Sequence, residues 1–160
     1  MKTPRRNKRL TRNGPAKQPQ PGGQPIGRSE NMRRIRSRNT KPELLLRRAL
    51  HKRGLRYRVH VPTLPGKPDI VFGGRRLAVF VHGCFWHQHP YCQQASDPRT
   101  NRDYWAPKLQ RNVQRDREHA STMESLGYST LTLWECEIEK DPENAADRVV
   151  LALNHPQEKV

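Results

Sequence analysis

The positive charge of this chain is concentrated in its first 60 residues, and this limits which part of it can build a core. Residues 1–60 hold 19 of the 31 Lys and Arg residues and only two acids, Glu30 and Glu43, a net charge of +17. The rest of the chain carries 12 basic and 13 acidic side chains, a net charge of −1. This concentration of positive charge favours binding to a polyphosphate, because each neutralised phosphate releases condensed counterions. We therefore expect a nucleic acid partner, DNA or RNA; the alternative is a basic tail that only aids solubility.

The segment 1–28 lacks the side chains of a hydrophobic core. It contains eight Lys and Arg residues, five Pro, four Gly and no acid, and Leu10 and Ile26 are its only large aliphatic residues. Such a segment cannot bury enough apolar surface to offset the entropy lost on ordering. We predict a disordered basic arm over residues 1–28 and one folded domain over residues 29–156.

Neither a membrane span nor a disulfide scaffold is expected. No apolar run approaches the roughly 18 residues that a membrane helix requires. The basic N-terminus is not followed by the apolar stretch of a secretory signal. Three cysteines would leave one unpaired, which argues for a reducing compartment. We expect a cytoplasmic, nucleoid-associated protein with no membrane partner.

Apolar periodicity from residue 29 onward predicts the element order α-β-β-β-α-β-α. Thr40 as N-cap, with Glu43 closing a capping box, begins a helix that Gly54 ends. The other predicted elements are strands at 55–61, 69–72 and 77–81, a helix at 106–126, a strand at 128–134 and a helix at 142–154. A Gly-Gly-Arg-Arg turn at 73–76 favours a hairpin between the second and third strands. This order predicts an α/β fold with a mixed sheet.

All three cysteines lie where they could share a metal ion with one histidine. Cys84, His89 and Cys92 fall within nine residues, and Cys136 follows a later strand. Together they would form a tetrahedral Cys3His zinc set. The alternative is that small buried cysteines pack as ordinary hydrophobic residues.

A carboxylate and a histidine are predicted to meet at one end of the sheet. Asp69 begins one hairpin strand and His82 ends the next, so the short turn brings them together. Carboxylate oxygens are ligands of Mg²⁺, and a histidine near its ordinary pKa can move a proton. The alternatives are that Asp69 caps a turn and that His82 and His87 are surface residues or support zinc.

Two adjacent aromatic residues lie in the loop that Gly83 begins, and they cannot both point into one core. Phe85 and Trp86 beside a basic surface could stack on bases or wedge between them. Trp105 is a third candidate for this surface.

Several strings of this sequence resemble the very short patch repair (Vsr) mismatch endonucleases. The resemblance covers about residues 29–138 in unbroken order, and the arm 1–28 lies outside it. The matching strings are NMRRI (31–35), NTKPE (39–43), LPGKPD (64–69), FVHGCFWHQH (80–89), NVQRD (112–116) and LWEC (133–136).

The resemblance implies a restriction-endonuclease-like fold, with an α-β-β-β-α-β core, a mixed sheet and a structural zinc site. It implies an Mg²⁺-dependent DNA endonuclease, a hydrolase that nicks 5′ to the thymine of a T·G mismatch arising from deamination of 5-methylcytosine. Catalytic Mg²⁺ and structural Zn²⁺ are the implied cofactors. Double-stranded DNA with a T·G mismatch is the implied partner, mismatch-repair proteins are further candidates, and a monomer is expected.

The resemblance also implies a role for each matching residue. Asp69 and the backbone of Val81 would hold Mg²⁺, although the family commonly has threonine at position 81. His87 would act as general base and His82 as the second catalytic histidine. Glu43 matches a glutamate near the site, and it fits a capping role equally well.

The remaining matches concern zinc and DNA. The zinc ligands would be Cys84, His89, Cys92 and Cys136, with a gap between His89 and Cys92 one residue longer than usual. The DNA contacts would come from Phe85, Trp86, Trp105, Met32, Lys108 and Asn112. Two alternatives stay open: a non-catalytic zinc-stapled nucleic-acid-binding module, and an endonuclease of the same fold with another specificity, for example in a restriction-modification system.

Overall fold

The computed structural model describes residues 38–95 and 101–154, and these residues contain a four-stranded mixed sheet. Its order is β1-β2-β3-β4, antiparallel from β1 to β3 and parallel between β3 and β4. The strands are β1 (Arg58–Val59), β2 (Ile70–Phe72), β3 (Leu77–His82) and β4 (Ser129–Trp134). The predicted mixed α/β architecture is confirmed. The predicted arm, both domain boundaries and Met32 lie outside the described residues.

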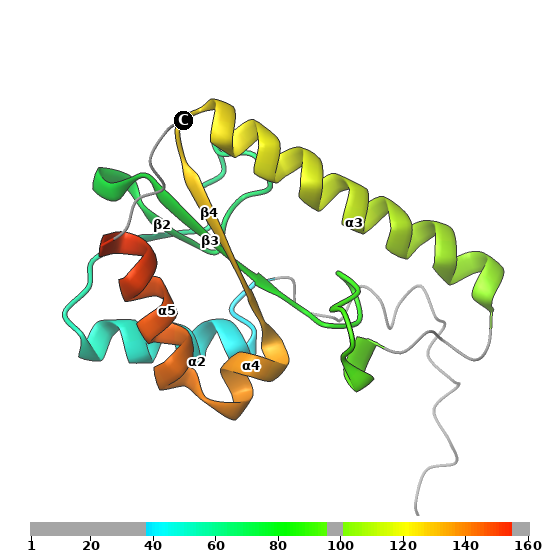
Figure 1. Ribbon diagram of the computed structural model, residues 1–160, viewed down its shortest axis with the longest axis horizontal. Coiled ribbons are helices and arrows are strands. Elements are labelled where there is room, and N and C mark those ends of the chain that lie inside the picture. Colours follow the sequence, from blue (N-terminus) through cyan, green and yellow to red (C-terminus); the bar gives the residue numbers. More distant parts are fainter. Residues whose placement is uncertain (1–37, 96–100, 155–160) are drawn as a thin grey trace, which may run out of the picture. The chain divides into compact units, whose positions relative to one another are not determined.

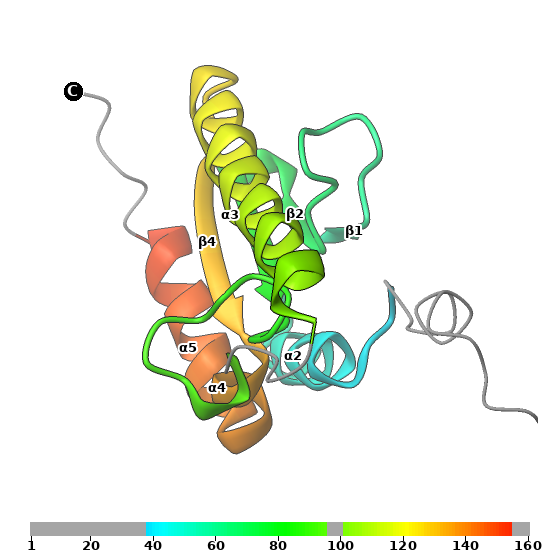
Figure 2. The same cartoon turned by 90° about the vertical axis from the view of Figure 1, so that its right-hand side faces the viewer.

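Helices cover both faces of this sheet (Figure 1). One face is covered by α2 (Lys41–Lys52), α4 (Glu135–Lys140) and α5 (Pro142–Asn154), which pack on one another. The long helix α3 (Arg102–Ser125) crosses the other face, as the turned view shows (Figure 2). Among the described residues, no helix is both long and apolar enough to cross a bilayer.

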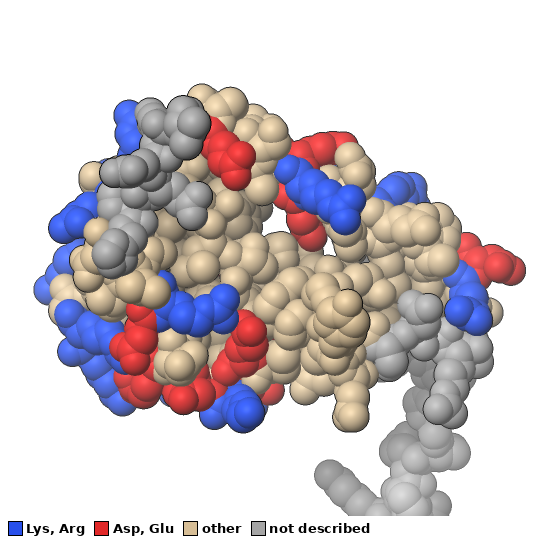
Figure 3. Space-filling model, viewed as in Figure 1, with Lys and Arg blue, Asp and Glu red and all other residues tan. Residues whose placement is uncertain are grey.

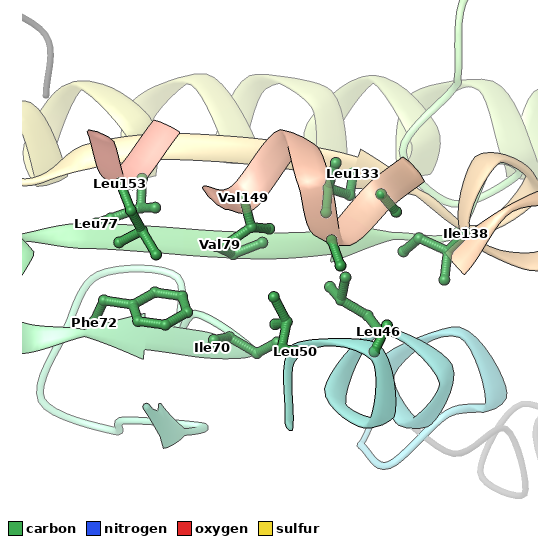
Figure 4. Packing of buried hydrophobic residues seen from close by; sticks show 13 residues of the cluster. Leu46, Leu50, Ile70, Phe72, Leu77, Val79, Leu133, Ile138, Val149 and Leu153 are labelled. Atoms are coloured by element: carbon green, nitrogen blue, oxygen red, sulfur yellow. The ribbon is translucent and has the colours of Figure 1, made fainter. Parts of the chain in front are cut away.

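The alternation of side chains along β3 and β4 separates the core from the cleft. On β3, Leu77 and Val79 face α2 and α5, and on β4 Leu133 does the same (Figure 4). The intervening residues, among them Phe80 and Thr132, face α3 and line a cleft. The main hydrophobic cluster therefore lies on one side of the sheet, and the polar side chains of the cleft lie on the other.

Helix α2 begins and ends where its capping residues predict. Thr40 is the N-cap, its backbone N–H donates to Glu43 Oε1 at 3.3 Å, and Gly54 adopts φ +72° just beyond the C-cap. Leu46 and Leu50 are fully buried. Leu44 is 40% exposed, because it lies two residues from Leu46 and points well away from the buried face.

The sequence predicted other elements less accurately. The strand predicted over 55–61 is only two residues long, since His60 turns the chain with φ +47°. Helix α3 begins at Arg102, four residues before its predicted start, and includes Pro107. Helix α4 was not predicted: it is six residues long and Ile138 is its only fully buried residue, so it carries no apolar period.

Candidate active site and metal centres

A cleft of about 580 Å³ lies between α3 and the polar face of the sheet. Figure 3 shows the surface hollowed beneath α3, with acidic and basic side chains at the edge of the hollow. Two clusters of titratable side chains line this cleft. The first contains Glu43, His60 and Asp69, and the second contains His82, His87 and Asp116.

Asp69 lies directly before β2 and faces the end of β3, as its position in the hairpin predicts. Its Oδ2 accepts a hydrogen bond from the Val81 N–H at 2.7 Å, and its Oδ1 lies 3.7 Å from His60 Nδ1. Burial raises the pKa of Asp69 to about 6, against the opposing effect of the Val81 hydrogen bond. A cation would remove this penalty on the ionised carboxylate, so the carboxylate chemistry fits a divalent ion.

Glu43 is buried and holds the N-terminus of α2. Its Oε1 accepts from the Thr40 N–H and hydroxyl, at 3.3 and 2.9 Å. Its Oε2 accepts from the Asn39 N–H at 3.0 Å and from Arg47 Nη2 at 2.9 Å. An ionised carboxylate offers about four lone-pair sites, and these four bonds use them all. The predicted capping role is thus present, and direct metal ligation would require Glu43 to give up one of these bonds.

His60 and Arg47 belong to this cluster, although the sequence singled out neither. His60 Nε2 lies 2.8 Å from Arg47 Nη2 and 3.3 Å from Glu43 Oε2. The sequence could not indicate His60, because it alternated with apolar residues as a solvent-facing strand residue would. Its place depends on the backbone turn at φ +47° and on pairing of its N–H with the Asp69 carbonyl at 3.3 Å.

The second cluster joins the end of β3, the loop after it and α3. His87 Nδ1 lies 2.6 Å from Asp116 Oδ2, and the His82 ring stacks on the His87 ring at 3.9 Å. Burial, assisted by His87, lowers the pKa of His82 to about 4, so His82 is neutral at pH 7. Because Asp116 accepts the Nδ1 proton, His87 Nε2 is the atom that can take a proton from water. The sequence contains no signal that would pair Asp116 with His87 across 29 residues.

The three cysteines and His89 converge as predicted. Cys84 Sγ and Cys136 Sγ lie 3.5 and 3.4 Å from His89 Nδ1, and Cys92 Sγ lies 3.9 Å from Cys136 Sγ. Tetrahedral zinc with ordinary bond lengths would set sulfurs about 3.8 Å apart and sulfur about 3.6 Å from nitrogen. The four side chains therefore fit a zinc ion.

Local backbone geometry and neighbouring side chains support this cluster. Tyr91 adopts φ +59° between His89 and Cys92. The Cys84 N–H donates to Glu135 Oε1 at 2.8 Å. The ring of Trp134 stacks on His89 at 4.2 Å and meets the edge of His82 at 5.5 Å. Trp134 thus lies between the cysteine cluster and the histidine pair.

The predicted aromatic residues form one cluster beside the cleft. The ring of Phe85 lies 5.1 Å from Trp86 and 5.5 Å from Trp105, and the two tryptophans are 5.9 Å apart. Lys108 Nζ lies 5.5 to 5.7 Å from the rings of Trp86, Trp105 and Tyr104. Tyr104, half exposed, was not predicted here, because no local pattern set the start of α3.

Asn112 connects this aromatic cluster to α3. Its side-chain Nδ2 donates to the Trp86 carbonyl at 3.1 Å, which holds the loop after β3 against the helix. Of the predicted DNA-contacting residues, all except Met32 thus lie close together. Met32 is outside the described residues.

Comparison with known proteins shows which family this chain is similar to. The family model described as DNA mismatch endonuclease Vsr matches residues 24–94. The Type II nicking enzyme V.XorIIP of Xanthomonas oryzae pv. oryzae is 45% identical over 107 residues, which cover 67% of this chain and 78% of that protein. The Type II nicking enzyme V.NaeI of Lentzea aerocolonigenes is 45% identical over 134 residues, 81% and 78% of the two chains. The DNA mismatch endonuclease Vsr of Escherichia coli K12 is 43% identical over 109 residues, 68% and 69% of the two chains.

Proposed function

This chain belongs to the Vsr family and is a DNA endonuclease, and from this premise we propose that it nicks double-stranded DNA 5′ to the thymine of a T·G mismatch. One observation carries the proposal. A carboxylate suited to a cation, Asp69, and a histidine oriented by a carboxylate, His87, line one cleft beside an aromatic cluster.

The proposed chemistry divides between these two residues. Asp69, with the backbone of Val81, would hold Mg²⁺, which when bound polarises the scissile phosphate. His87 Nε2 would take the proton of the attacking water, and Asp116 would stabilise the imidazolium that forms. His82, neutral and stacked on His87, would keep that ring in place.

The proposed mismatch preference rests on the aromatic cluster. A T·G wobble pair costs less to unstack than a Watson–Crick pair. Phe85, Trp86 and Trp105 would wedge into the weakened step, and Lys108 and Asn112 would contact the mismatch with Met32. Zn²⁺ would staple the loop that carries Phe85 and Trp86, because Cys84 and His89 lie on either side of these residues.

A second candidate is favoured by the names of two relatives. V.XorIIP and V.NaeI are named Type II nicking enzymes, which points to an endonuclease of the same fold that acts beside a restriction-modification system. The chemistry would be the same in both cases. The two candidates differ only in the DNA sequence around the nick.

Labelled duplexes that differ only at one base pair test the proposal. We expect Mg²⁺-dependent nicking of the T strand of a T·G duplex, at least tenfold faster than nicking of the matched T·A duplex. Equal rates on both duplexes would overturn the mismatch proposal. Binding without cleavage in Mg²⁺ would favour the non-catalytic module, and varying the flanking bases separates the two nicking candidates.

A further inference from the structure

Arg47 is held against one nitrogen of the His60 ring, Nε2. Its side chain is only 15% exposed, and its Nη2 lies 2.8 Å from His60 Nε2 and 2.9 Å from Glu43 Oε2. Its Nη1 donates to Asn39 Oδ1 at 2.8 Å. The guanidinium is therefore fixed by three partners and cannot swing away from the ring without breaking its bonds to all of them.

This contact selects one tautomer of His60. A guanidinium only donates hydrogen bonds, so His60 Nε2 must accept with its lone pair. A neutral imidazole then carries its single proton on Nδ1, which is the atom 3.7 Å from Asp69 Oδ1. The other tautomer, and the imidazolium, would place an N–H against the N–H of Arg47. Glu43 Oε2, which lies 3.3 Å from His60 Nε2, already accepts from Arg47 and from the Asn39 N–H.

We propose that Arg47 fixes His60 in the Nδ1–H form, and that His60 is a positioning residue for Asp69 instead of a ligand of the divalent cation. A ring nitrogen that carries a proton has no lone pair to give a metal. Nδ1 lies 3.7 Å from Asp69 Oδ1, too far for a hydrogen bond, so its proton acts on that oxygen electrostatically, while the Val81 N–H donates to Oδ2 at 2.7 Å. The two contacts together favour one orientation of the carboxylate.

The tautomer of His60 determines which kind of cation the site favours. Glu43, His60 and Asp69 present ligand atoms within 4.8 Å of one another, a mixed nitrogen and oxygen set. Imidazole nitrogen suits transition metals, whereas oxygen ligands suit Mg²⁺. Because Nε2 accepts from Arg47 and Nδ1 carries the proton, neither ring nitrogen has a lone pair free for a metal. The site therefore offers oxygen ligands only. This inference rests on the proposed function, because it takes Asp69 as the residue that holds the cation.

The tautomer is directly measurable in the metal-free cleft. Long-range ¹H–¹⁵N spectra of the full chain, with zinc retained and histidine labelled, separate protonated from unprotonated ring nitrogens. The signal that disappears in His60→Gln identifies His60, and we expect its Nδ1 protonated and its Nε2 bare. A protonated Nε2 would overturn the proposal. Arg47→Met should give a mixture or the other tautomer, and Arg48→Met, an exposed neighbour on α2, should leave the spectrum unchanged.

Cation binding provides a second, independent readout. Titration calorimetry should show that Arg47→Met binds Co²⁺ at least tenfold more tightly than the wild type, with Mg²⁺ affinity changed less than threefold. Adding His60→Gln to this variant should abolish the gain. If Arg47→Met does not fold, His60→Gln alone still decides the matter: a change in Co²⁺ affinity below threefold supports the proposal, and a tenfold loss shows ligation and overturns it. Asp69→Asn separates the two proposals, because unchanged Co²⁺ and Mg²⁺ binding in that variant would contradict the proposed function itself.

Discussion

His87 Nδ1 and Asp116 Oδ2 lie 2.6 Å apart, joining the loop after β3 to the middle of α3. The bond sets which nitrogen of His87 faces the cleft. It also makes α3 part of the site, although the helix contacts the sheet mainly through β4.

Asp116→Asn should lower the single-turnover nicking rate about 10²-fold, a loss typical of disturbed general acid–base catalysis. The amide cannot stabilise an imidazolium at His87, whereas the cation site at Asp69 is untouched. Cleavage of a labelled duplex at saturating protein measures the rate. Asp103→Asn, exposed in the first turn of α3, is the matched control and should keep the full rate. A rate for Asp116→Asn within threefold of the wild type would contradict the assignment.

Asp69→Asn should abolish nicking while leaving mismatch binding nearly unchanged. The substitution removes the charge that holds the cation and leaves the aromatic cluster intact. Nicking and gel-shift assays on the same duplex test the two halves of this expectation. More than about a tenth of the wild-type rate would be too much for a catalytic cation ligand, whose loss costs about 10²-fold or more.

Acid should destabilise the wild type more than the variant His82→Gln. Burial and the neighbouring His87 lower the pKa of His82 to about 4 in the fold, against about 6.5 when unfolded. The stability that this shift reflects is complete above pH 6.5 and is lost as pH falls toward 4, because the unfolded chain binds the proton first. The difference can reach about 3 kcal/mol, from about 1.4 kcal/mol per pKa unit. Urea unfolding at pH 7.5, 5.5 and 4.5 measures it, and parallel pH curves for the two proteins would refute it.

Cys136→Ser should loosen the fold and reduce metal content. A structural zinc ion contributes folding free energy directly, and serine is a poor replacement for a thiolate ligand. Elemental analysis should find one tightly bound zinc per wild-type chain, and thermal unfolding should show a lower Tm for the variant. A metal-free wild-type preparation with full activity and unchanged Tm would rule out a structural zinc.

Deletion of residues 1–28 should weaken binding to matched and mismatched duplexes about equally. The segment brings eight positive charges and only two large aliphatic residues, so it should add affinity without choosing a site. The salt dependence of binding should flatten by at most roughly 0.9 in slope for each phosphate that the segment neutralises. If truncation instead lowers the T·G over T·A preference tenfold, the segment reads the groove and the boundary at residue 28 is misplaced.

The sequence predicted best those features that depend on neighbours along the chain. The capping pair Thr40 and Glu43 and the hairpin turn at 73–76 are local signals, and the structure has both. The meeting of Asp69 and the end of β3 followed from the hairpin alone. The gathering of Cys84, His89, Cys92 and Cys136 was predicted from their residue types.

The sequence did not predict the features that depend on long-range packing. His60 reaches Glu43 and Asp69 only because its backbone leaves the extended conformation at φ +47°. Arg47 looked like one of many basic residues on an exposed helix face, and its burial depends on the partners that surround it. Asp116 lies on α3, whose placement over the sheet no local pattern specifies.

The 73–76 turn lies at a distance from the cleft, yet the geometry of the cleft constrains the length of this turn. The β2–β3 register pairs Phe72 with Leu77 and Ile70 with Val79, and it brings the Val81 N–H to Asp69. A one-residue insertion in the turn that slipped this register would move Leu77 and Val79 off the core face and separate Asp69 from Val81. Surface turns ordinarily tolerate insertions and deletions over evolutionary time. In this hairpin an insertion or deletion would alter the Asp69–Val81 contact at the opposite end of the strands. We therefore expect the turn to evolve by substitution and to keep its length.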